Sequence, residues 1–406
     1  MAAPVFTSRL SLYVMGLGGS ALGDAIWVVT LPFAVFAMLG RHDSVALAHV
    51  MTAAFLPRLL GLLWGSVVDR FDLRHLFITA GLLRLLLTAL LGAAFLTGAA
   101  TWPLVLLAAF LNGLLTALSS TSGSVLVPHL VPKEVLTRAN SLIQSVNMGL
   151  PLLGYGLGGA LVAALGSGPT LLVSAACFGV MPLVVSFIRM PPRDYTAARG
   201  RPLGQDIREG LAYLRGQRVL LLLGVTALMV NLTAVVLNIV IPTLMERAGA
   251  GARGYGLYEI VLSLGMLGGV ALSNLRPVEQ RGTGNIPLGL LSVAAGLAGN
   301  AATALGVVYV GAAALGLGFG LLTVSVISYF QAIVPTGLLG RVMGVLNSAN
   351  AVGYVVGAVG TGVILSHWPA TTLFVSLSGV TLALFVTVLL SLRAATSSSV
   401  QAGGQV

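Results

Sequence analysis

The chain has 406 residues, of which 57% are hydrophobic and 8% charged, with a mean hydropathy of +1.00 and a formal net charge of +10. Soluble domains carry about a quarter charged residues, so a soluble protein of this composition would lack the polar side chains to cover its surface. The excess of Arg is also unlike a nucleic-acid-binding face, because these residues lie in short segments between apolar runs. The composition therefore predicts a membrane protein that binds no nucleic acid.

The apolar runs are about 20 residues long or longer, which favours membrane-spanning helices over the alternating ten-residue strands of a barrel. Gly and Pro occur freely inside these runs, as membrane helices tolerate. In chain order, helices are expected at 10–39, 45–66, 75–97, 102–127, 138–165, 168–189, 218–245, 254–275, 285–303, 305–331, 340–366 and 369–392.

The distribution of basic residues predicts the orientation of these twelve helices. With the N-terminus inside, the inner loops hold sixteen Arg and Lys residues and the outer loops hold three, which are Arg41, Arg247 and Arg253. Inner loops of membrane proteins are enriched in basic residues. The sequence thus predicts an N-in, C-in, multi-pass protein, and the bacterial inner membrane is its expected location.

One long polar segment divides the chain near its midpoint. It contains seven Arg residues between 189 and 218 and begins with Pro and Gly, whereas Asp206 to Arg215 has helical spacing. We therefore predict an N-terminal six-helix bundle over 1–189, an inner linker over 190–217 and a C-terminal six-helix bundle over 218–406. A solvated connector is the favoured role of the linker, with a regulatory role as the alternative.

An internal repeat supports two related halves. At a shift of 203 residues Val131-Pro132 aligns with Val334-Pro335 and Arg138 aligns with Arg341. The matches continue through Ser145 and Ser348, Asn147 and Asn350, Gly154 and Gly357, and Gly159 and Gly362. Two parallel six-helix bundles related by pseudo-symmetry predict such a repeat. The fold class is therefore an all-α membrane protein.

The segment between the second and third expected helices has the order Gly65, Asp69, Arg70, Arg74. It resembles the loop signature Gly-x-x-x-Asp-Arg-x-Gly-Arg-Arg/Lys of the major facilitator superfamily, although Asp72 stands where Gly is usual. The resemblance implies that Gly65, Asp69, Arg70 and Arg74 form a latch that holds the two halves together on the inside. Plain loop anchoring is the alternative.

Two further segments narrow the resemblance. Gly154-Tyr155-Gly156-Leu157-Gly158-Gly159 is similar to the antiporter signature ending Gly-Pro-x-x-Gly-Gly, with Tyr155 in place of Pro. The first helix, with Asp24, and Leu56-Pro57-Arg58 resemble the drug-efflux branch that includes macrolide exporters and the enterobactin exporter. The glycines of the fifth helix of each half are expected to allow close helix packing, namely Gly154, Gly158, Gly159, Gly357 and Gly362.

Asp24 is the main candidate for energy coupling. It lies about 21 Å into its helix at 1.5 Å per residue, and a carboxylate near mid-membrane is costly unless it is paired, protonated or hydrated. It is interpreted either as a proton- or cation-coupling carboxylate or as a structural ion-pair partner of Arg58 or Arg84. Arg84 is expected about 13 Å deep, whereas Arg58 is shallow enough for its side chain to extend to the interface.

Neutral polar residues on the fourth, seventh, tenth and eleventh helices are candidates for lining a substrate cavity, since the resemblance implies a path lined by helices one, four, seven and ten. They are Asn112, Thr116, Asn231, Asn238, Thr323, Ser325, Asn347 and Asn350. Hydrogen bonds between helices are the alternative role for each of them. Glu259 is expected at the outer edge of the eighth helix.

The resemblance and the lone deep acid lead to a functional hypothesis. The chain is expected to be a monomeric secondary transporter that exports an amphipathic, drug-like or siderophore-like small molecule by alternating access and proton antiport. It is not expected to be an enzyme, to bind a metal or to need a cofactor, since the proton gradient supplies the energy. The alternatives are an importer or facilitator of a small nutrient or metal ion, and a lipid flippase.

Overall fold

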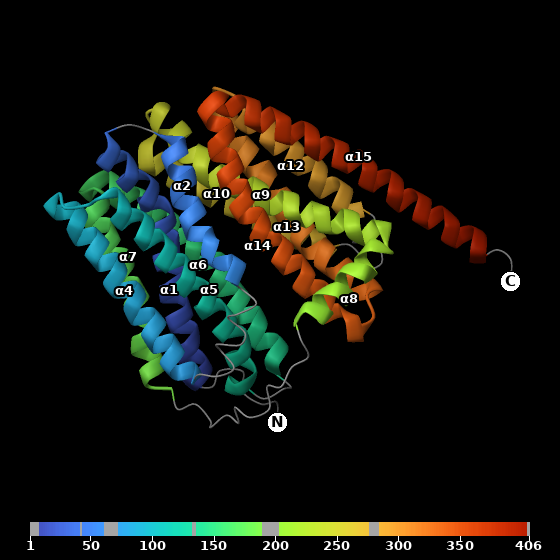
Figure 1. Cartoon of the computed structure of the whole chain (residues 1–406), viewed down its shortest axis with the longest axis horizontal. Coiled ribbons are helices and arrows are strands. Elements are labelled where there is room, and N and C mark those ends of the chain that lie inside the picture. Colours follow the sequence, from blue (N-terminus) through green and yellow to red (C-terminus); the bar gives the residue numbers. More distant parts are fainter. Residues whose placement is uncertain are drawn as a thin grey trace. The chain divides into compact units, whose positions relative to one another are not determined.

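The computed structural model describes residues 8–40, 43–60, 72–131, 135–188, 203–275 and 284–403 (Figure 1). Within these ranges every regular element is a helix and no strand occurs. The chain divides into two compact units, Met1–Arg199 with Asn238–Ile260, and Gly200–Leu237 with Val261–Val406. The seventh and eighth expected helices are α9 (Arg218–Arg247) and α10 (Gly251–Leu275), and each of them contributes residues to both units.

The first unit contains helices that start and end at the residues local chemistry favours. Asp43 precedes α2 and its carboxylate accepts hydrogen bonds from the backbone N–H groups of Val45 and Ala46, as an N-cap should. Gly98 ends α4 with φ 70°, in the left-handed region that glycine adopts without strain. The helices are α1 (Ser8–Leu39), α2 (Ser44–Phe55), the short 3-10 helix η1 (Leu56–Leu60), α4 (Leu73–Thr97), α5 (Trp102–Leu130), α6 (Leu136–Leu165) and α7 (Ser167–Ser186).

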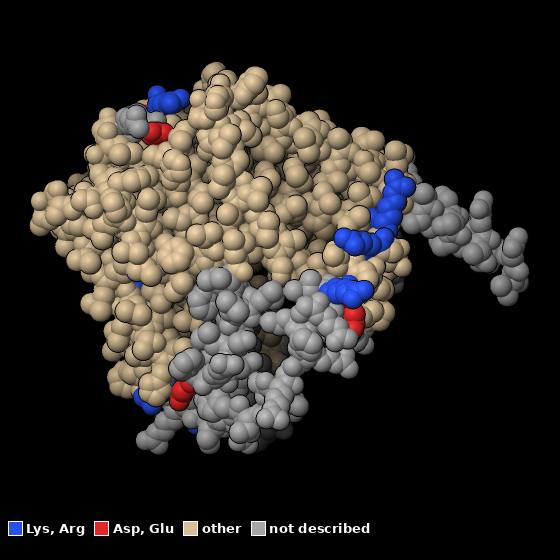
Figure 2. Space-filling view, viewed as in Figure 1, with Lys and Arg blue, Asp and Glu red and all other residues tan. Residues whose placement is uncertain are grey.

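Helix α1 lies against α6 and α7, α4 lies against α7 and α5, and α2 lies against α5. One face of α4 is buried and includes Arg84 and Thr88, whereas Leu86 and Leu90 are 61% and 60% exposed. Such a periodic apolar outer face is unfavourable in water and favourable in lipid. Figure 2 shows that charged side chains are few on the described surface of the face in view.

The second unit is built on close helix contacts. Helix α12 lies against α13 and α15, and glycines bring α10 and α13 into backbone contact, as a Cβ at Gly269 would lie 2.2 Å from the carbonyl oxygen of Leu317. The helices are α8 (Leu203–Arg215), α9 (Arg218–Arg247), α10 (Gly251–Leu275), α12 (Ile286–Asn300), α13 (Leu305–Ile333), α14 (Thr336–His367) and α15 (Ala370–Gly403). Close approach without bulky side chains is how membrane helices gain dispersion contacts.

Ten of the described helices are long and apolar enough to cross a membrane. Two shorter apolar helices, Ser44–Leu59 and Ile286–Asn300, lie where the second and ninth spans were predicted at 45–66 and 285–303. The count of twelve and the N-in, C-in orientation therefore remain predictions, whereas the all-helical membrane fold is confirmed.

The predicted helical stretch in the linker is α8. Glu209 of α8 forms an ion pair with Arg341 near the start of α14, and both side chains are partly exposed. This ion pair attaches the linker helix α8 to α14, which belongs to the same unit. Helix α14 is the repeat counterpart of α6, which begins at Leu136.

Candidate functional site

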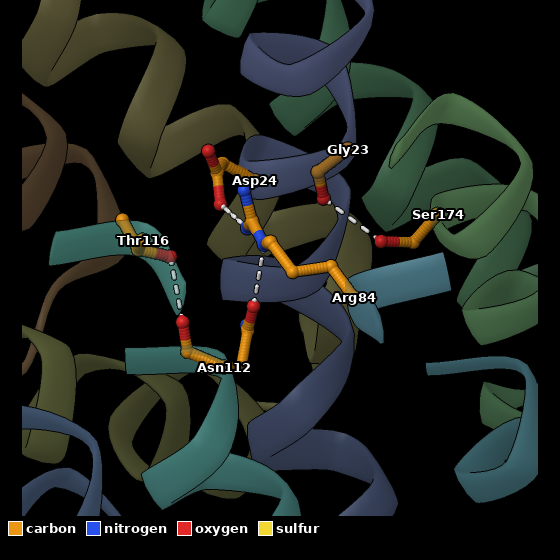
Figure 3. Close-up of polar contacts among 6 residues, drawn as sticks. All are labelled: Gly23, Asp24, Arg84, Asn112, Thr116 and Ser174. Atoms are coloured by element: carbon orange, nitrogen blue, oxygen red, sulfur yellow. Dashed lines mark hydrogen bonds and ion pairs between the residues drawn. The ribbon is translucent and has the colours of Figure 1, made fainter. Parts of the chain in front are cut away.

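Asp24 lies in the middle of α1, about 24 Å along the helix from Ser8 at 1.5 Å per residue. Its neighbour Gly23 accepts a hydrogen bond through its carbonyl oxygen from the hydroxyl of Ser174 on α7, at 2.9 Å (Figure 3). A Cβ at Gly23 would lie 2.7 Å from the ring of Phe178, so the absence of a side chain there allows α1 and α7 to approach. This close packing fixes the position of Asp24 along α1 relative to α7.

Arg84 of α4 is the partner of Asp24. Its Nη2 donates to Asp24 Oδ1 and its Nε donates to Oδ1 of Asn112 on α5, the latter at 2.8 Å (Figure 3). The guanidinium carbon lies 3.8 Å from the centroid of the Phe178 ring, which adds a cation–π contact. Arg84 is 4% exposed and Asp24 42% exposed, so the cation is enclosed by protein while the carboxylate faces open space.

That open space is a cavity of about 560 Å³ within the first unit. Neutral hydrogen-bonding groups and apolar groups share its wall, and Asp24 and Arg84 supply the charge. The lining residues include Tyr13, Ser20, Asp24, Arg84, Thr116, Ser119, Asn140, Gln144, Asn147 and Phe178. Asp24 also faces a neighbouring pocket of about 310 Å³, where Asn147, Pro151 and Tyr155 join it.

Two of the predicted lining residues belong to this site in different ways. Asn112 is 5% exposed and is directed at Arg84, so it orients the guanidinium. Thr116 lines the cavity, and its hydroxyl donates to the backbone carbonyl of Asn112 at 2.8 Å. The fourth expected helix therefore contributes both a support for the cation and part of the wall.

The second unit has its own pocket of about 220 Å³, lined by Asn231, Thr323, Asn347 and Asn350. Tyr354 donates a hydrogen bond to Oδ1 of Asn231. Asn147 and Asn350, which the repeat aligns, thus line the pocket of their respective units. The described pocket contains no charged residue among its lining residues.

The remaining lining candidates lie in packed surroundings. Asn238 accepts a hydrogen bond from the hydroxyl of Tyr255 at 3.5 Å in the first unit. Ser325 is fully buried, 3.4 Å from the hydroxyl of Ser273. Both make the contacts between helices that were named as the alternative role.

The glycines of the fifth helix of each half lie at helix contacts. A Cβ at Gly154 would lie 2.6 Å from Cβ of Ala25, one at Gly158 would lie 3.2 Å from Cα of Ile26, and one at Gly159 would lie 2.6 Å from the carbonyl of Ala252. In the second unit a Cβ at Gly357 would lie 3.5 Å from Cγ of Leu232, and Gly362 is buried.

Arg58 and the loop motif are placed only in part. The Arg58 guanidinium lies 4.8 Å from the centroid of the Phe55 ring, while the described ion pair of Asp24 is with Arg84. Gly65, Asp69 and Arg70 lie outside the described residues. Arg74 donates from Nη2 to the carbonyl oxygen of Ser186, near the end of α7.

Several members of the site were not predicted. Phe178 and Ser174 sit in an apolar, small-residue run, where nothing in the local pattern separates them from packing residues. Tyr155 was noted only because it stands in place of Pro in the signature of the fifth helix. Glu259 was expected at the outer edge of its helix; it lies eight residues after Gly251, the first residue of α10, and is 6% exposed. An acid inside an apolar helix was the signal that should have drawn attention to it.

The arrangement describes a class of protein. An enclosed cation, a half-exposed carboxylate and a cavity walled by hydrogen-bonding groups lie within helices that are long and apolar enough to span a membrane. Among the described residues, no group of three His, Cys, Asp or Glu is placed to hold a metal ion. These features are typical of a multi-pass membrane transporter.

Comparison with known proteins identifies the family. Residues 13–281 match the Major Facilitator Superfamily profile, and the chain belongs to this superfamily of membrane transporters. The "Uncharacterized MFS-type transporter y4rN" of Sinorhizobium fredii is 28% identical over 382 residues, covering 89% of each chain. The "Uncharacterized MFS-type transporter YfiS" of Bacillus subtilis is 24% identical, covering 92% of this chain and 91% of the relative.

Solved structures share the fold. The crystal structure of the nucleoside transporter NupG matches with a TM-score of 0.74 at 11% identity, over 96% of this chain and 99% of that one. A bacterial homolog to the human lysosomal transporter Spinster, in an inward-facing and occupied conformation, matches with a TM-score of 0.66 at 14% identity, over 96% of each chain. At these identities the likeness shows the fold alone.

Proposed function

We propose that the chain is a secondary active transporter that exports an amphipathic, drug-like or siderophore-like small molecule by alternating access and proton antiport. The observation that carries the proposal is the Asp24–Arg84–Asn112 network on the wall of a 560 Å³ cavity. The cavity volume falls within the range of about 300 to 1,000 Å³ typical of small-molecule sites. The expected setting is the bacterial inner membrane, with the chain acting as a monomer of twelve spans.

The network provides a means of coupling. When Asp24 is ionised it offsets the charge of Arg84, and when it is protonated it leaves Arg84 as the uncompensated cation beside the cavity. The two protonation states therefore present different charges to a bound molecule. A change of this kind is what lets proton binding and substrate binding affect each other.

Apolar side chains such as Leu17, Phe77, Ile143 and Met181 alternate around the cavity with Ser, Thr, Asn and Gln. A wall of both kinds fits a molecule that has an apolar body and several hydrogen-bonding groups. The same hydrogen-bonding groups favour one second candidate, an importer of a polar nutrient. The direction of the substrate flux relative to the proton flux separates the two.

The test is transport in proteoliposomes with a panel of amphipathic and polar candidate compounds, with and without an imposed pH gradient. Wild-type protein should accumulate an amphipathic compound only when the pH gradient drives protons in the direction opposite to the movement of the compound. Asp24→Asn should abolish this accumulation while preserving counterflow exchange, because an amide cannot release a proton. Accumulation at the wild-type rate by Asp24→Asn would show that the coupling site lies elsewhere.

Asp43→Asn is the matched control. Asp43 is an acid of the same unit that caps α2, and Asn is an equally good N-cap. It should leave both accumulation and exchange unchanged. Accumulation of a compound along the direction of the proton flux would instead favour the nutrient importer.

A further inference from the structure

A second acid lies inside the membrane-spanning part of the first unit. Glu259 is eight residues after the first residue of α10, about 12 Å along the helix at 1.5 Å per residue. Its side chain is 6% exposed. The transport scheme above does not use it.

The described groups around Glu259 come from several helices, and those named below are tyrosines, a phenylalanine and an asparagine. Tyr255, one turn earlier on α10, is completely buried, and Gly256 beside it packs on the backbone of Tyr155 of α6. Tyr258 also lies near Tyr255 on α10. From α1 the ring of Phe33 packs against Tyr255 with centroids 6.3 Å apart, and from α9 Asn238 accepts from the Tyr255 hydroxyl.

Glu259 and Asp24 differ in the cations that lie beside them, and this difference affects which protonation state each acid favours. The charge of Asp24 is matched by Arg84, whereas across the described residues the recorded ion pairs include none with Glu259. Enclosing an ionised carboxylate without a counter-ion costs several kcal/mol, and the neutral acid avoids most of this cost. The hydroxyl of a tyrosine serves both forms, since it donates to an ionised carboxylate and accepts from a carboxylic acid.

Residues packed against the α10 turn that carries Glu259 line two pockets. On one side Phe33, Glu246 and Arg253 line a pocket of about 430 Å³, and Phe33 leads to Tyr255 by ring contact. On the other side Tyr155 lines the pocket that contains Asp24. The α10 turn that carries Glu259 packs closely on α6, since a Cβ at Gly256 would lie 2.5 Å from the carbonyl oxygen of Tyr155.

We infer that Glu259 is a proton-binding site, separate from the Asp24–Arg84 pair, on a path that runs from the Arg253 pocket through Tyr255, Glu259 and Tyr155 to the Asp24 pocket. The ionised carboxylate takes one proton from water at one pocket to give the neutral acid. It returns the proton to water at the other pocket and is ionised again, so one positive charge moves and no other reactant is needed. The inference rests on the proposed function only in taking the coupling ion to be a proton.

Infrared difference spectroscopy tests proton binding without a known substrate. The full-length protein is reconstituted in lipid nanodiscs, and spectra in acidic and alkaline buffer are subtracted. A protonated carboxyl group gives a C=O stretching band that an ionised carboxylate lacks. We expect the wild type to show a band component that Glu259→Gln lacks and that both Asp24→Asn and the control Glu246→Gln retain.

Glu246 is a suitable control because it lies at the end of α9 in the same unit and lines the Arg253 pocket. A Glu259→Gln spectrum identical to that of the wild type overturns the inference. Should this variant not fold, Glu259→Asp keeps a titrating carboxyl group in an altered setting and should shift the frequency of the band. An unshifted band in a folded Glu259→Asp protein also overturns the inference.

The outcome is separable from that of the transport proposal. A band that depends on Glu259, together with no accumulation under any pH gradient, supports the proton site and contradicts proton antiport. Accumulation that depends on Asp24, together with a band insensitive to Glu259, supports antiport and overturns the second site.

Discussion

Arg84 is the residue on which the charged network of the first unit depends. It is 4% exposed, and its guanidinium contacts a carboxylate, an amide and an aromatic ring from three other helices. A buried Arg is costly in a membrane unless such partners are present. Asp24 is therefore expected to stabilise the fold as well as to serve in coupling, and the two roles are measurable separately.

A double-mutant cycle measures the stabilising role. Breaking a fully buried pair costs about 3 to 5 kcal/mol, and since Asp24 is partly solvated we expect Asp24→Asn to lower the free energy of unfolding in detergent by about 1 to 3 kcal/mol. Arg84→Gln added to Asp24→Asn should recover part of this loss, because the uncompensated cation is removed. Denaturant unfolding of the two single variants and the double variant gives the coupling energy.

Arg58 provides the comparison for that cycle. It lies on the short helix η1 beside Phe55, and its coupling to Asp24 should be smaller than that of Arg84. Additive losses for Asp24→Asn and Arg84→Gln would mean that Asn112 and Phe178 satisfy Arg84 on their own. A stronger coupling for Arg58 would contradict the network described above.

At the scale of elements, adjacent glycines on α10 have different surroundings. A Cβ at Gly269 would lie 2.2 Å from the carbonyl oxygen of Leu317 and 2.9 Å from the backbone nitrogen of Leu321, both on α13. A Cβ at Gly268 would meet nothing within 4 Å. The packing of α10 against α13 therefore requires the absence of a side chain at Gly269 but not at Gly268.

Gly269→Ala should force α10 and α13 apart and lower the free energy of unfolding by about 1 to 3 kcal/mol, the usual cost of overpacking. Gly268→Ala should be neutral or stabilising by up to about 1 kcal/mol, because Ala is the better helix former. The measurement is the unfolding midpoint of both variants in the same detergent. Equal midpoints would show that α10 moves to accommodate the methyl group at no cost.

At the scale of the whole molecule, one glycine contact occurs at corresponding positions of both units, but the charge beside it does not repeat. Gly154 approaches Leu22 and Ala25 of α1, and its repeat counterpart Gly357 approaches Leu232 and Val235 of α9. By this correspondence the position of Asp24 is taken by Ala234 in the second unit. A carboxylate on one side only makes the first unit the expected place of proton coupling, with the second unit supplying neutral groups.

The family loop motif supports a prediction about alternating access. Asp69→Asn should weaken the latch implied by the resemblance and increase the population that is open to the inside. Cysteines at Asn147 and Asn350, which line their units' pockets, should then react about 3-fold to 10-fold faster with an impermeant thiol reagent in inside-out vesicles, as expected for a shift of about 0.6 to 1.4 kcal/mol. Cys177, the single native cysteine, is first replaced by Ser.

Asp72→Asn is the control for this experiment. Asp72 belongs to the same segment and caps α4 by accepting from the backbone N–H of Arg74 at 2.7 Å, and Asn preserves the cap. Its labelling rates should equal those of the cysteine variants alone. Unchanged rates in Asp69→Asn, with unchanged transport, would leave loop anchoring as the role of the motif.

The sequence by itself determined the all-helical membrane class and the superfamily, and it predicts two related halves. These follow from local properties, since the length of an apolar run, a repeated Val-Pro or Asn and a loop motif do not depend on what the helices later contact. It also identified Asp24 and Arg84 as the deep charges, because a charged side chain in an apolar run is conspicuous wherever the run lies.

Only the tertiary structure decided which of these groups meet. It joined Asp24 to Arg84, directed Asn112 at the guanidinium rather than only at the cavity, and buried Glu259 in the α10 turn that packs against Tyr155. Which faces of helices meet depends on the sum of many weak packing contacts along α1, α4, α6 and α10, and residues far apart in the chain contribute to it. A carboxylate with a cation beside it and one without differ in chemistry, yet in the sequence both are single acids in apolar helices.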